Sequence, residues 1–425
     1  MRQEKNNIFL NLDWVLILLY FILVAFGWMN IYAASSTNTS GEVFDFSTKY
    51  GKQILWIFLS FPLIIFILFF NSKFYERFAS VLYLISLTSL VGLFLFGKNI
   101  NGATSWYNFG GVGLQPSEFA KAFTALAVAK LMSDRQYSLK LIKNQIKAFI
   151  IIFTPAFLIT LQPDPGSALI YLSFFFVLNR EGLTLSYIIL GFLAILLFIL
   201  TLYFGTKIIL LACFILITLA LLYGMYKERQ FLRFNLLRFL TIYAIVGLFV
   251  YGVGFAYNSV FEQRHRDRFD VLLGRKIDTK NIGYNSYQSE LTISSGGFWG
   301  KGYLQGDRTQ GHFVPEQHTD YIFSTVGEEW GFWGSSLVII LFMGLLYRII
   351  YLAETHTNKF GRIYGYGLAS ILFFHIIVNI GMVIGLLPTV GIPLPFFSYG
   401  GSGLWGFTLL LFIFIRLDAH KKYDW

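Results

Sequence analysis

Residues Trp14–Ala34 read WVLILLYFILVAFGWMNIYAA, an apolar run without a charged side chain. A run of this length crosses the ~30 Å hydrocarbon core of a bilayer as a helix. It is longer than the apolar region of a signal peptide, and no clear small-residue cleavage site follows it. We therefore expect Trp14–Ala34 to be a retained first membrane span.

Similar apolar runs recur along the chain. Of its 425 residues, 56% are hydrophobic and 13% are charged, whereas soluble domains carry about 25% charged residues. We expect one all-α integral membrane domain over residues 1–425, a polytopic transmembrane helical bundle of about twelve spans. The predicted spans are Trp14–Ala34, Gln53–Phe70, Phe78–Phe96, Ser117–Met132, Ala148–Leu161, Ser167–Leu178, Tyr187–Phe204, Ile208–Tyr226, Phe239–Phe255, Phe332–Leu352, Ile363–Leu387 and Leu404–Ile415.

The basic residues predict the orientation of the chain. A net charge of +10 could indicate nucleic acid, but in a membrane protein Lys and Arg gather in cytoplasmic loops. Both termini and alternate loops are basic, and the opposite short loops hold only Lys49, Lys52, Lys98 and Lys207. We expect cytoplasmic termini, no nucleic-acid partner, and a long, ordered extracytoplasmic loop at about 256–331.

The stretch GLQPSEFAKAF, residues 113–123, brings ionisable groups to a predicted span. Ser117 can cap a helix, and Glu118 and Lys121 lie three residues apart on one face. An ionisable residue inside a span costs about 2.5–3.5 kcal/mol, so it usually faces a polar cavity or a partner. Two interpretations remain open: a neutralising pair that fixes helix packing, or a functional pair.

The stretch LQPDPGSAL, residues 161–169, places Asp164 between two prolines. Proline interrupts a helix on either side of this residue. An aspartate at such a break favours a capping role, with its side chain accepting from backbone amides near Ser167.

The predicted outer loop carries two polar stretches. RHRDRFDVLLGRKID, residues 264–278, is rich in Arg and Lys, and it predicts either contact with lipid headgroups or a pyrophosphate, or a solvated surface. GHFVPEQHTDYIFSTVGEEWG, residues 311–331, holds two histidines among carboxylates, but their spacing fits no strong metal motif. These residues by themselves allow either an enzyme acting on a lipid-linked substrate or a transporter.

Six ordered motifs carry a family resemblance over nearly the whole chain. They are NGATSW at 101–106, QPSEFAK at 115–121, LQPDPGSAL at 161–169, GYNSYQSELTISSGGFWGKG at 283–302, PEQHTDYIFSTVGEEWG at 315–331 and GIPLPFFSYGGSG at 391–403. The chain resembles the RodA/FtsW (SEDS) family of peptidoglycan glycosyltransferases, and it is most similar to the RodA branch.

The resemblance implies polymerisation of lipid II into β-1,4 glycan strands at the outer face of the bacterial cytoplasmic membrane during cell elongation. It implies Asp278 as the general base for the acceptor hydroxyl, which typically contributes ~10²–10⁴-fold, and an inverting displacement without a covalent nucleophile. It also implies a class B penicillin-binding protein and the elongation machinery as partners. A flippase for lipid-linked precursors and a non-catalytic scaffold remain the alternatives.

The same resemblance assigns the substrate site. Lys121, Arg266, Arg268 or a divalent cation (Mg or Mn) would stabilise charge on the leaving pyrophosphate, and no other cofactor is implied. Glycines within 283–302 would bring the backbone close to the substrate. The expected substrate-binding residues are Glu118, Lys121, Arg266, Arg268, Gln288, Ser289, Trp106, Asp164, His318 and Asp320.

The chain departs from the family pattern in two ways. Ser105 stands where the family usually has Arg. The family has ten spans, so twelve predicted spans indicate a two-span insertion at about 187–226. An even insertion preserves the sidedness of every later segment.

Overall fold

The computed structural model describes residues 11–36, 44–100, 102–110, 112–227, 232–260, 263–273 and 283–420. The chain divides into two compact units, one formed by Met1–Leu183 with Tyr284–Trp425 and the other by Thr184–Gly283. The helices and strands of the first unit are α1 (Trp14–Ser35), α2 (Lys49–Phe69), α3 (Ser72–Phe96), β1 (Lys98–Ile100), β2 (Ala103–Phe109), β3 (Val112–Leu114), α4 (Pro116–Ser133), α5 (Ile142–Thr160), α6 (Pro165–Leu169), η2 (Ile170–Ser173), α7 (Phe174–Arg180), α12 (Tyr284–Gly296), α13 (Asp307–Gln310), α14 (Ile322–Glu329), α15 (Gly331–Glu354), α16 (Lys359–Val383) and α17 (Gly401–His420).

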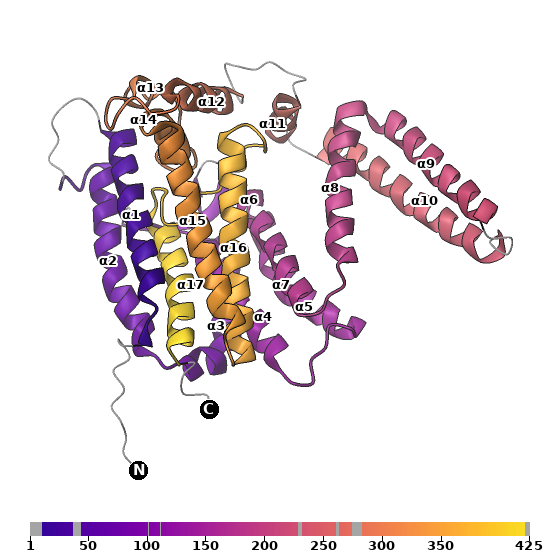
Figure 1. The fold of residues 1–425 in the computed structure, drawn as a ribbon, viewed down its shortest axis with the longest axis horizontal. Coiled ribbons are helices and arrows are strands. Elements are labelled where there is room, and N and C mark those ends of the chain that lie inside the picture. Colours follow the sequence, from indigo (N-terminus) through magenta and orange to yellow (C-terminus); the bar gives the residue numbers. More distant parts are fainter. Residues whose placement is uncertain are drawn as a thin grey trace, which may run out of the picture. The chain divides into compact units, whose positions relative to one another are not determined.

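The first unit is a helical bundle built around α4, α16 and α17 (Figure 1). Helix α4 packs against α3, α5, α16 and α17. The apolar windows of α16 and α17 are 72% and 78% buried, compared with 22% for α2 and 28% for α3. The outer helices therefore present their apolar side chains outward, as expected for helices that face lipid.

All twelve predicted segments are helical, which confirms the all-α membrane fold. Among the described residues, ten helices are long and apolar enough to span a membrane. Helix α4 and the interrupted run from α6 to α7 are not among them, so the number twelve is not confirmed. Helix α4 carries Glu118 and Lys121, and the run from α6 to α7 is broken by a 3₁₀ segment.

Local signals in the sequence set where several helices begin. Asp13 caps α1 by accepting from the Leu16 amide at 2.9 Å, and Asp164 caps α6 as predicted. The prediction that Ser117 caps a helix is wrong. Pro116 occupies the first position of α4, so the helix begins earlier and Ser117 lies buried inside its first turn.

A small antiparallel sheet, in the order β1-β2-β3, precedes α4. Lys98 pairs with Trp106, and Tyr107 pairs with Leu114. The sheet delivers the chain from the end of α3 to the start of α4, which places the first turn of α4 inside the bundle. Short helices α12, α13 and α14 form the part of the predicted long loop that belongs to this unit.

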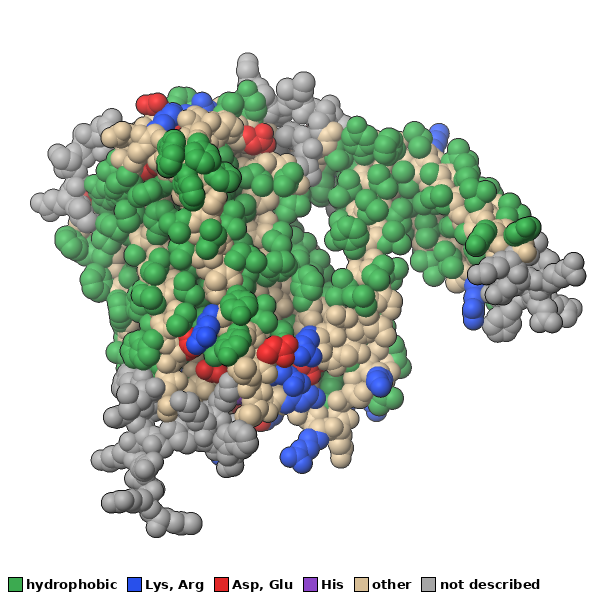
Figure 2. Space-filling view, in the orientation of Figure 1, with side chains coloured by type: hydrophobic (Ala, Val, Ile, Leu, Met, Phe, Trp, Pro, Cys, Tyr) green, Lys and Arg blue, Asp and Glu red, His purple; other side chains and the backbone are tan. Residues whose placement is uncertain are grey.

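Charged side chains gather at the two ends of the first unit, with hydrophobic side chains between them (Figure 2). At the end where α1 begins, Arg348 pairs with Asp13 at 2.5 Å and Arg362 pairs with Glu181 at 3.2 Å. These residues come from regions that the alternation of basic loops placed on one side. The structure therefore agrees with that alternation within this unit.

The second unit consists of α8 (Ser186–Phe204), α9 (Thr206–Lys227), α10 (Leu232–Phe255), a π-helical turn at Ala256–Val260 and α11 (Gln263–Leu272). Helices α8, α9 and α10 pack on one another. A side chain at Gly254 would lie 2.4 Å from Thr206 Oγ1, so glycine permits the close approach of α10 to the start of α9. Helices α8 and α9 correspond to the two spans that we predicted as an insertion.

Candidate active site

Two charged side chains are buried inside the first unit, in the first turns of α4. Glu118 and Lys121 are only 4% and 2% exposed. Lys121 Nζ lies 2.9 Å from each carboxylate oxygen of Glu118. The two residues therefore form an ion pair, which compensates both charges where water is excluded.

His375 on α16 is a third member of this cluster. Its Nε2 lies 2.9 Å from Lys121 Nζ, and its Nδ1 lies 3.2 Å from the carbonyl oxygen of Pro393. Because an ammonium group only donates, Nε2 accepts, and the ring proton is then on Nδ1 and points to Pro393. Lys121 thereby uses its three donors on Glu118 and His375.

Helix α17 closes one side of this cluster. The ring centroid of Phe407 lies 5.0 Å from Lys121 Nζ, and the ring packs edge-on against His375. A side chain at Gly406 would lie 2.9 Å from Glu118 Cβ, so only glycine allows α17 to approach this closely. The aromatic face and the burial of both charges strengthen the electrostatic interactions inside the cluster.

Polar side chains connect the starts of α4, α6 and α17. Gln115 Nε2 donates to Asp164 Oδ2 at 3.0 Å, and Asp164 also accepts from the amide and hydroxyl of Ser167. The backbone amide of Gln115 donates to Ser402 Oγ, and the Ser402 hydroxyl donates to the Gly113 carbonyl. Asp164 therefore lies where helix N-termini, with their positive partial charges, meet.

The segment 390–393 joins Asp320 to the same region. After α16 the chain turns back, and α17 begins below the top of the bundle (Figure 1). Asn379 Nδ2 donates to the carbonyl oxygens of both Asp320 and Ile392 at 2.7 Å. A side chain at Gly391 would lie 3.3 Å from Asp320 Oδ2. Segment 390–393 thus contacts Asp320, Asn379 and, through Pro393, His375.

His318 lies close to Asp320 in the chain and is 7% exposed. Its Nδ1 is 3.5 Å from Lys49 Nζ. Burial, followed by the charges of Lys49 and His312, lowers the pKa of His318 to about 4. His318 is therefore neutral at neutral pH and can serve as a hydrogen-bonding group rather than as a cation.

Glu328, at the end of α14, holds together the cap formed by α12, α13 and α14. It accepts from Lys301 Nζ at 2.9 Å, from Ser295 Oγ at 3.1 Å, and from the amides of Arg308 and Thr309. Burial acts to raise the pKa of Glu328, but these hydrogen bonds outweigh it and hold the pKa below its usual value. Glu328 therefore remains ionised.

Two further residues that were predicted to bind substrate, both on α12, make hydrogen bonds within the protein. Gln288 Oε1 accepts from Arg308. Ser289 is fully buried, and its hydroxyl donates to the Val383 carbonyl at 2.8 Å. These contacts fix α12 to the segment around Arg308 and to the end of α16.

Two of the glycines in 283–302 approach another part of the protein, and the prediction that glycines of this stretch bring the backbone close to the substrate stays a prediction. A side chain at Gly296 would lie 2.0 Å from the carbonyl oxygen of Gly327, and one at Gly300 would lie 2.2 Å from that of Glu329. The close approach that these two glycines permit is to α14. It allows the amide of Lys301 to donate to the Glu328 carbonyl at 3.0 Å.

The remaining predicted residues are Trp106, Arg266, Arg268 and Asp278. Trp106 is in β2, where it packs against Gly113. Arg266 is on α11 in the second unit and donates to the Asn258 carbonyl at 3.2 Å. The side chain of Arg268 and all of Asp278 lie outside the described residues.

Sequence reasoning missed His375, Asn379 and Arg308. A signal for the first two was present, because both are polar residues inside the apolar run Ile363–Leu387, spaced by four on one helix face. Within the described part of the chain, no group of three or more His, Cys, Asp and Glu side chains is placed to hold a metal ion.

The fold and the site together define a polytopic helical membrane protein with a buried ion-pair cluster and an ordered polar cap at one end. A family model described as FTSW_RODA_SPOVE, cell cycle protein, matches residues 13–212 and 185–423. The chain belongs to this family.

Named relatives support this assignment. The peptidoglycan glycosyltransferase MrdB of Escherichia coli strain K12 is 34% identical over 349 residues, which cover 82% of this chain and 80% of that protein. The peptidoglycan glycosyltransferase RodA of Treponema pallidum is 29% identical, over 96% of this chain and 98% of that protein.

Solved structures share the fold. A chain of a peptidoglycan synthase complex, in a structure concerned with the coordination of polymerization and crosslinking, matches with a TM-score of 0.71 at 24% identity, over 97% of this chain and 99% of that chain. The rod shape determining protein RodA of Thermus thermophilus matches with a TM-score of 0.63 at 24% identity, over 97% and 98%.

Proposed function

We propose that this chain is a peptidoglycan glycosyltransferase that polymerises lipid II into glycan strands during cell elongation. The observation that carries the proposal is the 34% identity to the peptidoglycan glycosyltransferase MrdB over 82% of this chain. The buried cluster of Glu118, Lys121 and His375 supports it, because ionisable groups inside a membrane bundle usually serve function.

Asp278 is the proposed general base. It would take the proton of the acceptor sugar hydroxyl as that oxygen attacks the anomeric carbon of the donor, while the lipid pyrophosphate leaves. One displacement of this kind inverts the α-linked donor into a β-1,4 product. The reaction therefore needs no covalent nucleophile on the protein.

Negative charge builds on the leaving pyrophosphate, and we assign Arg266 and Arg268 to it. Lys121 is less suited to direct contact, because its three donors are used by Glu118 and His375. Lys121 is instead a positioning residue, which fixes α4 against α16 and α17. Arg side chains also match the geometry of phosphate oxygens better than Lys does.

The end of the first unit that carries α12, α13 and α14 is proposed to face outward, and both termini to lie in the cytoplasm. This orientation follows from the basic loops and places the polar cap on the side where lipid II is polymerised. A class B penicillin-binding protein is the proposed partner, because it would supply the crosslinking activity. The resemblance to a chain of a peptidoglycan synthase complex is consistent with such a partner.

Purified full-length protein incubated with lipid II tests the proposal. The wild type should make glycan polymer, and Asp278→Asn should reduce the rate by about 10²–10⁴-fold. Asp307→Asn is a matched control, because Asp307 is 86% exposed in the same outer region, and it should keep wild-type activity. Polymer yield from Asp278→Asn equal to that of the control would refute the general-base assignment.

The same preparation separates the alternatives. A flippase would move lipid II across a vesicle bilayer without lengthening glycan. A non-catalytic scaffold would make no polymer alone and would depend on an added polymerase. Polymer made by the purified chain without any partner excludes both.

A further inference from the structure

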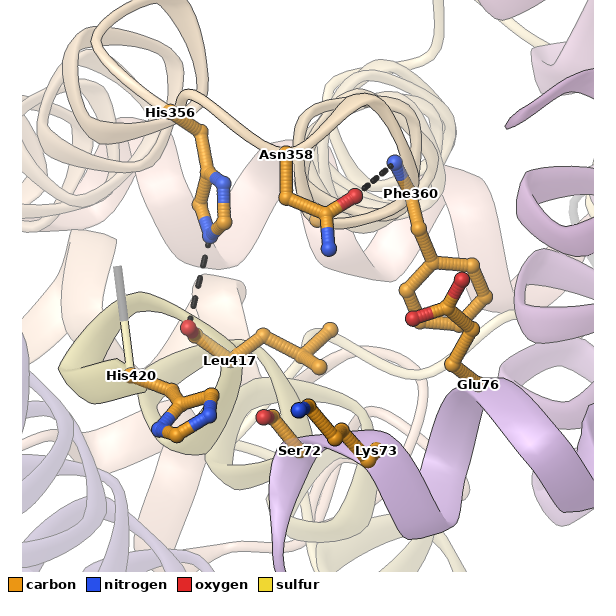
Figure 3. Close-up of a pocket in the computed structure, with 9 residues that line it drawn as sticks. Ser72, Lys73, Glu76, His356, Asn358, Phe360, Leu417 and His420 are labelled. Carbon is orange, nitrogen blue, oxygen red and sulfur yellow. Dashed lines mark hydrogen bonds between the residues drawn. The ribbon is translucent and has the colours of Figure 1, made fainter. Parts of the chain in front are cut away.

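A pocket lies at the end of the first unit opposite α12, α13 and α14, and no role has been given to it so far (Figure 3). It is formed by the first turns of α3 and α16, the last turn of α17 and the loop before α16. Its polar side chains are Ser72, Lys73, Glu76, His356, Asn358 and His420. These groups come from segments far apart in the sequence.

Several of these groups are left without protein partners. Ser72 is 8% exposed, yet within the described part of the chain its hydroxyl makes no hydrogen bond. Lys73 and Glu76, one turn apart on α3, form no ion pair among the described residues. Ser72 and Lys73 both line the pocket, and in Figure 3 the Asn358 amide nitrogen points toward the side of the pocket that they form.

The residue before Ser72 leaves the start of α3 without a side-chain cap. Asn71 occupies the N-cap position of α3, but its side chain makes no capping bond. Its Oδ1 instead accepts from Nη2 of the buried Arg416 at 3.1 Å. The N-cap side chain therefore accepts from none of the first amides of α3.

This combination of groups selects the chemistry of a ligand. A hydroxyl, an ammonium, an amide and an uncapped helix start are the donors that bind a phosphate. The carboxylate of Glu76 would repel a simple anion, but it would attract an amine on the same molecule. A phosphate diester that also carries a primary amine therefore satisfies both charges of α3.

We propose that this pocket binds the headgroup of an ethanolamine phospholipid. The phosphate contacts Ser72, Lys73 and Asn358, and the amine contacts Glu76. The pocket lies where membrane-spanning helices begin and end, which is the level of lipid headgroups. Free inorganic phosphate could contact the same donors, but it has no amine for Glu76. A comparison of lipid binding with phosphate binding therefore distinguishes a lipid headgroup from free phosphate as the ligand.

Native mass spectrometry on the delipidated full-length protein tests the proposal. The protein is titrated with an ethanolamine phospholipid and, separately, with a glycerol phospholipid. Wild type should bind the ethanolamine lipid at least about threefold more tightly. Lys73→Gln should weaken that binding about tenfold or more, and Ser72→Ala about threefold. Glu76→Gln should weaken only the ethanolamine lipid and abolish the preference.

Lys143→Gln is the matched control, because Lys143 is an exposed lysine at the same end, in the first turn of α5. It should bind both lipids like the wild type. Equal binding of the two lipids by wild type, or equal loss in Lys73→Gln and the control, would overturn the proposal. Displacement of the lipid by millimolar inorganic phosphate would overturn it too. Each variant is first checked for an unchanged thermal midpoint, and Ser72→Ala provides a near-isosteric change if Lys73→Gln does not fold.

Discussion

Two neighbouring carboxylates, Glu328 and Glu329, have opposite protonation behaviour although both are buried. Glu328 is held ionised by Lys301 and by the amides of Arg308 and Thr309. For Glu329, burial raises the pKa to about 7, and the nearby charge of Glu328 adds to this, while backbone amides oppose it. A single residue step along α14 thus separates a structural anion from an acid that titrates near neutrality.

The raised pKa of Glu329 predicts a pH-dependent stability. The unfolded side chain titrates near 4.5 and the folded one near 7. Glu329 contributes up to about 2–3 kcal/mol to the free energy of unfolding. This contribution is complete below pH 4.5 and is lost as the pH rises through 7. Glu329→Gln should therefore match wild type in thermal midpoint at low pH and exceed it at pH 8. A difference in thermal midpoint between the two proteins that is independent of pH would contradict the assignment.

The buried pair of Glu118 and Lys121 predicts strong coupling. Lys121→Met alone leaves a carboxylate without its cation and should cost about 3–5 kcal/mol, and Glu118→Gln alone should also destabilise. The double variant should be more stable than the sum of the two losses implies, by at least about 1 kcal/mol. Thermal unfolding in detergent of the wild type, the two single variants and the double variant gives a double-mutant cycle. Strictly additive losses of stability would show that the two residues do not interact.

At the scale of elements, the turn at 297–302 is shaped to fit α14. The amides of Lys301 and Gly302 donate to the carbonyls of Glu328 and Glu329 at 3.0 Å. Gly300 has a φ of +79° and touches the α14 backbone, whereas Gly297 has a φ of +58° and nothing within 4 Å of an added Cβ. The polar, glycine-rich motif therefore forms a close joint between α12 and α14.

These two glycines provide a matched pair of substitutions. Gly297→Ala should cost only the strain of a left-handed residue, about 1–2 kcal/mol. Gly300→Ala carries the same strain and adds a contact of 2.2 Å with the Glu329 carbonyl, so it should destabilise by clearly more. Thermal midpoints of both variants measure the difference. Equal losses of stability in the two variants would show that the contact between the turn and α14 can shift without an energetic penalty.

For the whole molecule, the arrangement of spans decides on which side the polar cap lies. Ten helices of the described chain meet the length and hydropathy of a span, and α8 and α9 are two of them. If they form a hairpin inserted into the family's ten-span fold, every later loop keeps its side. An odd number of added spans would instead move residues 256–331 into the cytoplasm, away from lipid II polymerisation.

Cysteine labelling tests this topology. In a Cys213→Ser background, which removes the only cysteine, Thr206→Cys at the first residue of α9 should react with an impermeant thiol reagent from outside. Gln230→Cys, in the segment between α9 and α10 that lies outside the described residues, should react only after the membrane is opened. The reverse pattern would overturn the proposed orientation of the chain.

The sequence by itself determined the membrane fold, the helical segments, the alternation of basic loops and the pairing of Glu118 with Lys121. Each depends on runs of apolar residues or on spacing within one helix, which short-range physics controls. Only the tertiary structure decided that His375 accepts from Lys121 and that Gly300 faces α14. It likewise decided that Asn71 turns to Arg416 and leaves α3 uncapped. These are contacts between residues up to hundreds of positions apart, and they arise because side chains and backbones must fill one closely packed interior.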